Sequence, residues 1–362
     1  MEFGIGFGQE ISAAEVPEYI RMAEEAGFEH ATFVDMGSPS REVHVMMTSA
    51  ALNSERINIG HGVTDPITYH PQVLANAVGT LRELTDGRAF VGLGTGGRLR
   101  KATDLPGARI DQMREAMRFI RAYTAGEDAT LGKGTWHSEW MRRSPYAGEP
   151  VPIRLAVSGP RMCRLGGELA DAVFSIGINP MLQGWRKEMV QRGAEAAGRD
   201  PSKIDFWVRT QIYIAESKEA AYTELAPYAA GCAEEIALSL RRTKSPEMIE
   251  LANRIEREHP GLLDEFQQIT DCHDHYSVER VGAAQAQPVT QRCIDFFLAS
   301  GTVEDVREQL EPLRELGIKG VSNVTFALYD MKGHDQEGGD RFDGSLRLME
   351  SASVSPELRL CQ

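Results

Sequence analysis

The sequence has no excess of positive charge and few cysteines. Its formal net charge is −14, since 53 Asp and Glu residues outnumber 39 Lys and Arg residues. A surface of that sign repels the phosphates of nucleic acids and of anionic membranes, so we expect neither as a partner. The five cysteines are odd in number and widely scattered, which fits neither a disulfide framework nor a CxxC metal site. We therefore expect a reduced, cytoplasmic protein.

Long apolar runs are also missing. No window approaches the roughly 18 uninterrupted apolar residues of a membrane-spanning helix. Residues 1–7 lead directly into a strand-like run and lack the basic flank of a signal peptide. Hydrophobic residues nevertheless make up 42% of the 362 residues, which is enough for one large core. These properties indicate an ordinary globular protein.

One unit recurs along the chain: an amphipathic helix, a short polar turn and an apolar strand. Four copies span residues 15–35, 71–93, 165–176 and 302–324, and further strands are expected at 3–7, 57–60, 152–157 and 204–215. Continuous apolar strands that alternate with helices predict a parallel sheet covered on both faces. About eight such units favour an α/β fold closed into a (β/α)8 TIM barrel over an open, doubly wound sheet.

The stretch from about 217 to 300 breaks this rhythm. It is helix-rich and too long for one barrel helix, so it predicts a helical insertion late in the chain. We expect one domain over residues 1–330 that includes this insertion, followed by a loop and one peripheral helix over 331–362. In barrels the active site lies at the carboxyl ends of the strands, where long insertions commonly act as lids.

A glycine-rich run follows the expected strand at 89–93. Gly92, Gly94 and Gly97 match the GxGxxG dinucleotide fingerprint. However, no amphipathic helix opens after them and no acidic residue ends a strand about 20 residues later, as that fingerprint requires. We expect these glycines to let the backbone approach a large, flat group.

Residues Ser158, Gly159 and Pro160 form a better candidate for phosphate binding. A helix begins directly after them, so its free N–H groups and the positive end of its dipole point at this loop. Gly177 opens the neighbouring loop, whose backbone donors could close on the same phosphate. The alternative is an ordinary strand-to-helix turn with proline at the first helical position.

Asp35 is the one candidate catalytic residue. It ends an expected strand, where an acidic residue either caps the next helix or takes part in chemistry. Residues 271–275 read Asp-Cys-His-Asp-His, which are metal-ligand types, but their spacing matches no standard site and we expect no metal. The sequence contains neither a serine nucleophile elbow nor a P-loop.

Taken in order, these loops resemble the bacterial-luciferase-like superfamily of flavin- and deazaflavin-dependent barrels. The nearest branch is the one that contains the methylenetetrahydromethanopterin reductases. The likeness covers roughly residues 1–205 and, more weakly, 276–328. It rests on the segments AEEAGFE at 23–29, INIGHGVTDP at 57–66, HP at 70–71, TLRELTDGR at 80–88, GLGTG at 92–96, SGP at 158–160 and ADA at 170–172.

The resemblance implies two ends of a cofactor site. A cis peptide between Gly62 and Val63 would back the isoalloxazine ring, with Thr64 beside it, Asp35 lining the ring pocket and Thr95 among the cofactor contacts. At the other end, the cofactor's 5′-phosphate would be held by Ser158, Gly159, Pro160, Gly177 and Ile178.

Two positions depart from the family pattern. Deazaflavin enzymes typically have an Asp-His pair where this chain has Asp35-Met36, and the reductase branch has a glutamate where Gly6 stands. A pocket with fewer polar groups suits the protection of an oxygen adduct from water. We therefore expect a monooxygenase that oxygenates a small organic substrate with reduced FMN, supplied by a separate flavin reductase. The alternatives are hydride transfer with coenzyme F420 and a non-catalytic flavin-binding barrel; as in many family members, a homodimer is expected.

Overall fold

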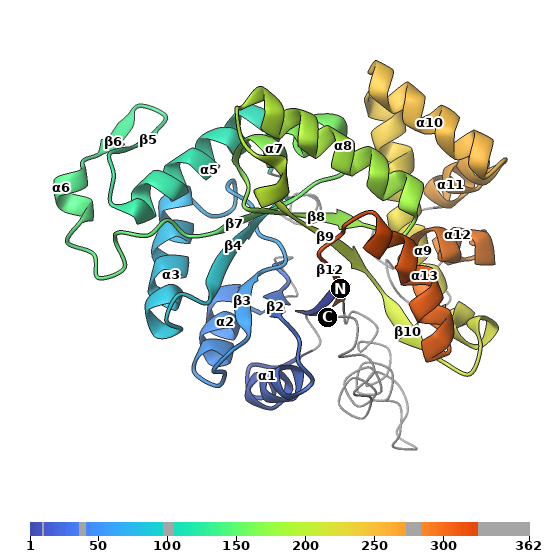
Figure 1. Cartoon of the computed structure of the whole chain (residues 1–362), viewed down its shortest axis with the longest axis horizontal. Helices are drawn as coiled ribbons and strands as arrows, with labels where there is room; N and C mark the ends of the chain where they lie inside the picture. Colours follow the sequence, from blue (N-terminus) through green and yellow to red (C-terminus); the bar gives the residue numbers. More distant parts are fainter. Residues whose placement is uncertain (9–10, 36–40, 97–104, 273–283, 325–362) are drawn as a thin grey trace.

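The computed structural model describes residues 1–8, 11–35, 41–96, 105–272 and 284–324. Its centre is a closed barrel of eight strands, all paired in parallel, in the order β1-β12-β9-β8-β7-β4-β3-β2 (Figure 1). The strands are β1 (Glu2–Phe7), β2 (His30–Phe33), β3 (Asn58–His61), β4 (Ala89–Leu93), β7 (Ile153–Ala156), β8 (Ala172–Ile176), β9 (Asp205–Thr210) and β12 (Gly320–Val324). The predicted TIM barrel is confirmed.

Helices cover the outside of the barrel. They are α1 (Val16–Glu25), α2 (Val43–Ala51), α3 (Pro71–Leu84), α5 (Ile110–Ala125), α7 (Pro160–Leu169), α8 (Pro180–Ala196) and α13 (Val303–Glu315). Three of them begin with proline, whose fixed φ suits the first helical position and whose missing N–H costs nothing there. All five residues of β4 are buried, as expected for a strand covered on both faces.

Aromatic side chains and one arginine fill the barrel near the amino ends of its strands. Phe90, Phe174 and Trp207 form a buried cluster there. The Arg154 guanidinium carbon lies 3.7 Å from the centroid of the Phe90 ring, a cation–π contact. Burial lowers the pKa of Arg154 to about 10, so this arginine is still protonated at neutral pH. The interior is therefore packed at this end, and a ligand site belongs at the other.

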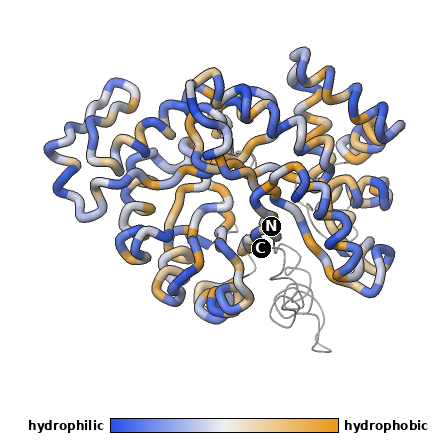
Figure 2. Tube along the Cα trace, in the orientation of Figure 1, coloured by the Kyte–Doolittle hydropathy of each residue, from blue (hydrophilic) through white to orange (hydrophobic). Residues whose placement is uncertain are grey.

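Late helices follow the barrel strand β9, as the sequence predicted. They are α9 (Lys218–Arg242), α10 (Pro246–Glu258), α11 (Leu262–Asp271) and α12 (Gln291–Phe297). Figure 2 shows apolar and polar residues alternating along α10 and α11, which pack as amphipathic helices. Within the described ranges, no helix is both long and apolar enough to cross a membrane.

Two features differ from the sequence-based expectation. The strand expected at 204–215 is divided: β9 ends at Thr210, and β10 (Ile212–Ile214) pairs instead with β11 (Ala299–Gly301). A small hairpin, β5 (Ala129–Leu131) with β6 (Gly134–Trp136), and the short helix α6 (Ser138–Met141) lie between α5 and β7 and were not predicted. The helix expected within 331–362 falls outside the described residues.

Candidate functional site

The loop after β3 carries a cis peptide bond between Gly62 and Val63, as the resemblance implied. Thr64 is almost fully buried beside it, and its hydroxyl donates a 2.6 Å hydrogen bond to the Asp35 carboxylate at the end of β2. The backbone N–H of Thr64 donates to Gly92 O at 2.9 Å, and Gly94 N–H donates to Thr64 O at 2.8 Å. Three strand ends are thereby held together at the carboxyl rim of the barrel.

The glycines after β4 serve the contact between these two loops. A Cβ on Gly92 would lie 2.0 Å from the carbonyl oxygen of His61, and one on Gly94 would lie 2.7 Å from Val63. Any larger residue would push the loops apart. Gly92 and Gly94 are therefore required for packing between the loops, whereas the approach of this backbone to a flat ligand stays a prediction; Gly97 lies outside the described residues.

Tyr69 adds a hydroxyl group to this region that sequence reasoning missed. Burial, followed by the carboxylates of Asp35 and Glu42, raises the pKa of Tyr69 to about 12. The phenol is thus protonated at neutral pH and is a hydrogen-bond donor beside two carboxylates. Of the two departures from the family pattern, Gly6 lies buried in β1, whereas Met36 is outside the described residues.

A second polar group lies behind the cis peptide. His61 is fully buried at the end of β3, and its Nε2 lies 3.2 Å from Nε2 of His44 on α2. His44 Nδ1 lies 2.8 Å from the carboxylate of Glu42. Burial, with a smaller contribution from His44, lowers the pKa of His61 to about 3, so His61 is neutral under physiological conditions. Glu42 and His44 lie together at the start of α2, whereas His61 lies on β3, and no local pattern in the sequence joins it to them.

The expected phosphate loop lies at the start of α7. Gly159 is the N-cap residue of α7 and, as a glycine, has no side chain to accept a hydrogen bond from the first turn. Pro160 occupies the first helical position. A Cβ on Gly159 would meet no atom within 4 Å, so open space faces this residue. Free N–H groups of a first helical turn that face open space fit an anionic group such as a phosphate.

Gly177 and Ile178 contribute less than the sequence predicted. The N–H of Gly177 donates to Arg209 O at 3.0 Å, and the N–H of Ile178 donates to Phe297 O at 3.1 Å. Both donors are therefore used within the protein, and the expectation that they close on a phosphate is wrong in that respect. Gly177 has a φ of +93°, which glycine adopts readily and which lets the chain turn sharply after β8.

Side chains of α8 hydrogen-bond to both the loop before α7 and the end of β8 with the loop that follows it. Arg186 is 1% exposed, and its Nη1 donates to Ser175 Oγ at 2.8 Å and to Ile176 O at 2.5 Å, while its Nε lies 3.4 Å from Ser158 O. Gln183 Nε2 donates to Ile176 O at 3.0 Å and also to Gly177 O. Burial lowers the pKa of Arg186 below its ordinary value. An arginine in an amphipathic helix reads as exposed, so sequence reasoning missed this one.

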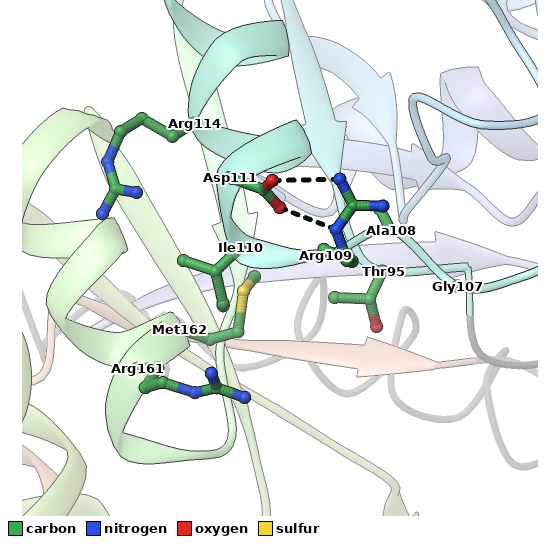
Figure 3. A pocket seen from close by; sticks show the side chains of 9 residues that line it. All are labelled: Thr95, Gly107, Ala108, Arg109, Ile110, Asp111, Arg114, Arg161 and Met162. Atoms are coloured by element: carbon green, nitrogen blue, oxygen red, sulfur yellow. Dashed lines mark hydrogen bonds and ion pairs between the residues drawn. The ribbon is translucent and has the colours of Figure 1, made fainter.

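A cavity of about 600 Å³ adjoins the start of α7. We call it the arginine recess; its lining residues are Thr95, Gly107, Ala108, Arg109, Ile110, Asp111, Arg114, Arg161 and Met162 (Figure 3). Thr95, one of the expected cofactor contacts, lies two residues after the end of β4 and lines this recess. A phosphate-bearing cofactor with its ring at Thr64 and its phosphate at Gly159 fits these observations.

Comparison with known proteins places the chain among flavin and deazaflavin enzymes. It is 29% identical to 5,10-methylenetetrahydromethanopterin reductase of Methanolobus tindarius, over 88% of this chain and 92% of that protein. It is 30% identical to F420-dependent hydroxymycolic acid dehydrogenase of Mycobacterium tuberculosis, over 77% and 81%. The structure of the coenzyme F420-dependent tetrahydromethanopterin reductase from Methanopyrus kandleri superimposes with a TM-score of 0.72, at 22% identity, over 90% of this chain and 93% of that one.

Of the two sequence relatives, the one at 30% identity is named as F420-dependent, and the Methanopyrus structure, at 22% identity, shows a shared fold. The structure of a long-chain alkane monooxygenase also matches, covering 99% of this chain and 91% of that one, with a TM-score of 0.63. At 13% identity that match shows a shared fold and no more. The model of the luciferase-like monooxygenase family matches residues 1–320. The chain belongs to this family and is a luciferase-like oxidoreductase.

Proposed function

We propose that the protein is an F420-dependent oxidoreductase that transfers a hydride between the deazaflavin and a small organic substrate. The observation that carries the proposal is the set of relatives at 26–30% identity that are named as F420-dependent enzymes or as methylenetetrahydromethanopterin reductases. The residues at the carboxyl rim of the barrel support it independently. They offer acidic and hydroxyl groups at the proposed ring end.

The proposed cofactor site has a ring end and a phosphate end. The ring would lie against the Gly62–Val63 peptide and Thr64, and the phosphate against the first turn of α7 at Ser158, Gly159 and Pro160. Thr95 would contact the cofactor between them, and Gly177 with Ile178 would form the neighbouring wall. When bound, F420 supplies a two-electron hydride donor or acceptor.

The groups that would act on a proton in this site are Asp35, Thr64 and Tyr69. Asp35 accepts the Thr64 hydroxyl hydrogen at 2.6 Å, which fixes the orientation of that hydroxyl. Tyr69 keeps its proton because its pKa is raised to about 12. A protonated phenol beside a carboxyl group can hold a proton for a substrate heteroatom during hydride transfer. Asp35 is the proposed catalytic residue.

This polar arrangement departs from the dry pocket on which the monooxygenase expectation was based. A monooxygenase needs to exclude water from a reactive oxygen adduct, and three hydrogen-bonding side chains at the ring would work against that. The same side chains suit a reaction in which a hydride and a proton are delivered to one substrate. The substrate would be an imine, a carbonyl compound or a pterin-like molecule.

The test is to follow oxidation of reduced F420 without oxygen. The purified protein is mixed with reduced, deuterium-labelled F420 and with ketones, imines or a methylene-tetrahydropterin, and the return of absorbance near 420 nm is recorded. We expect recovery in the absence of oxygen and deuterium in the product, with a rate lowered about a hundredfold or more by Asp35→Asn. Oxidation that requires oxygen, or turnover with reduced FMN alone, would overturn the proposal.

A further inference from the structure

The arginine recess begins where the proposed phosphate site ends. Arg161 and Met162 directly follow Pro160 in the first turn of α7 and form one wall. Arg109 and Asp111, at the start of α5, form another, with Thr95 nearby (Figure 3). Its volume of about 600 Å³ falls within the range of small-molecule sites and greatly exceeds what one phosphate group fills.

Positive charge is in excess around this recess. Arg109 forms a two-point ion pair with Asp111, at 3.1 and 3.0 Å. Arg114 and Arg118 share a single carboxylate, that of Glu168, each at 2.9 Å. Arg161, by contrast, has no carboxylate partner among the residues that the structure describes. Three arginines (Arg109, Arg114 and Arg161) and one carboxylate (Asp111) line the recess itself, an excess of two positive charges on a chain whose formal net charge is −14.

The existing ion pairs leave the recess able to accept an anion. Both members of the Arg109–Asp111 pair have 68% of their side-chain surface exposed, and solvent screens such exposed pairs so that they contribute little to stability. A ligand carboxylate could thus replace Asp111 at little cost. Among the described ranges no carboxylate pairs with Arg161, so within that part of the chain this arginine has no partner to exchange.

From these observations, and resting on the proposed function, we propose that the arginine recess binds the carboxylate-bearing tail that follows the phosphate of coenzyme F420, with Arg161 as its principal contact. FMN ends at its phosphate, whereas F420 continues through a phosphodiester into a lactyl and glutamyl chain. The Arg161 guanidinium, which has no carboxylate partner in the described part of the chain, follows the proposed phosphate site directly and matches the first carboxylates of that tail in charge and in hydrogen-bond geometry. The recess would therefore discriminate between the two cofactors.

The experiment compares two probes on one protein. Dissociation constants are measured by fluorescence titration for F420 with its glutamyl tail and for the same deazaflavin truncated after its 5′-phosphate. For Arg161→Gln we expect tailed F420 to bind about threefold to tenfold more weakly at low salt, with the truncated probe unchanged. Salt at about 0.5 M should reduce the difference between the probes, and Arg161→Lys should restore part of the affinity.

Arg257→Gln is the matched control. Arg257 is likewise an exposed arginine with no carboxylate partner among the described residues, and it lies in the last turn of α10, away from the recess. We expect this variant to bind both probes as the parent does.

Each outcome decides one claim. If Arg161→Gln weakens both probes equally, Arg161 contacts the phosphate and the tail assignment is overturned. If it weakens neither while the parent binds F420, the inference alone fails. If the parent binds neither probe, the proposed function fails first. If Arg257→Gln loses as much affinity for tailed F420 as Arg161→Gln does, the effect comes from net charge alone and the assignment is also overturned.

Discussion

Replacing Arg186 tests how the two loops at the proposed phosphate end are held. Its guanidinium reaches Ser175 Oγ, Ile176 O and Ser158 O from a fully buried position on α8. Arg186→Met keeps much of the volume and removes every donor. Ile176 O retains its hydrogen bond from Gln183, so two acceptors, Ser175 Oγ and Ser158 O, lose this partner.

The expected cost follows from those two acceptors. A buried acceptor left without its donor costs about 1–3 kcal/mol, which gives about 2–6 kcal/mol for the pair. Removing the buried cation offsets part of this loss, because the free-energy cost of desolvating its charge disappears with it. We expect Arg186→Met to lower the free energy of unfolding by about 2–4 kcal/mol in urea denaturation. Arg186→Lys, with fewer donors and no planar fork, should fall between parent and Met variant.

Cofactor affinity provides the second readout for these variants. Loosening the Ser158 carbonyl should weaken F420 binding in folded Arg186→Lys, because the Gly159 turn is the proposed phosphate contact. An Arg186→Met protein as stable as the parent, with unchanged F420 affinity, would refute the view that this arginine positions the loops.

Three further predictions concern α8, the buried histidines and the phosphate turn. Gly193→Ala should lower the free energy of unfolding in urea by about 2–4 kcal/mol, because the new Cβ would lie 2.1 Å from Arg164 O on α7. Gly184→Ala on the same helix is the control and should be neutral or stabilising, because its Cβ would have no neighbour closer than 3.8 Å. Equal effects of the two substitutions would contradict the packing argument. His61 has a pKa of about 3 when folded against about 6.5 unfolded, so stability is full above pH 6.5 and is lost as the pH falls towards 3. His61→Gln should therefore shrink the loss between pH 7 and pH 5 by about 2 kcal/mol in urea titrations, and an unchanged loss would show that His61 is protonated in the folded state. Gly159→Asp should leave the fold intact, since open space faces this residue. The new carboxylate should repel the cofactor's phosphate and weaken F420 binding at least about tenfold. Unchanged affinity in a folded variant would place the phosphate elsewhere.

The barrel could be predicted because its signal is local and repeated. Strands such as Ala89 to Leu93 are short apolar runs, and in four units the strand follows an amphipathic helix whose period is visible in the sequence. The cis peptide at Gly62–Val63 could be expected only from the family resemblance, since nothing in the local sequence requires it.

The polar groups around the rim could not be predicted, because they come from distant parts of the chain. His44 and His61 belong to α2 and β3, and their Nε2 atoms meet only once the helix has packed on the barrel. Arg186 sits in a helix whose polar residues read as exposed, yet its neighbours are backbone carbonyls. The N–H of Ile178 is used by Phe297 O, which the late helices bring in from more than 100 residues away.

The most direct test of the central claim is a competition between the two cofactors. The parent protein is titrated with F420 and with FMN under the same conditions, and binding is followed by the fluorescence of each cofactor. Our account predicts micromolar or tighter binding of F420 and at least about tenfold weaker binding of FMN, a difference of about 1.4 kcal/mol or more. FMN binding as tight as or tighter than that of F420 would contradict it.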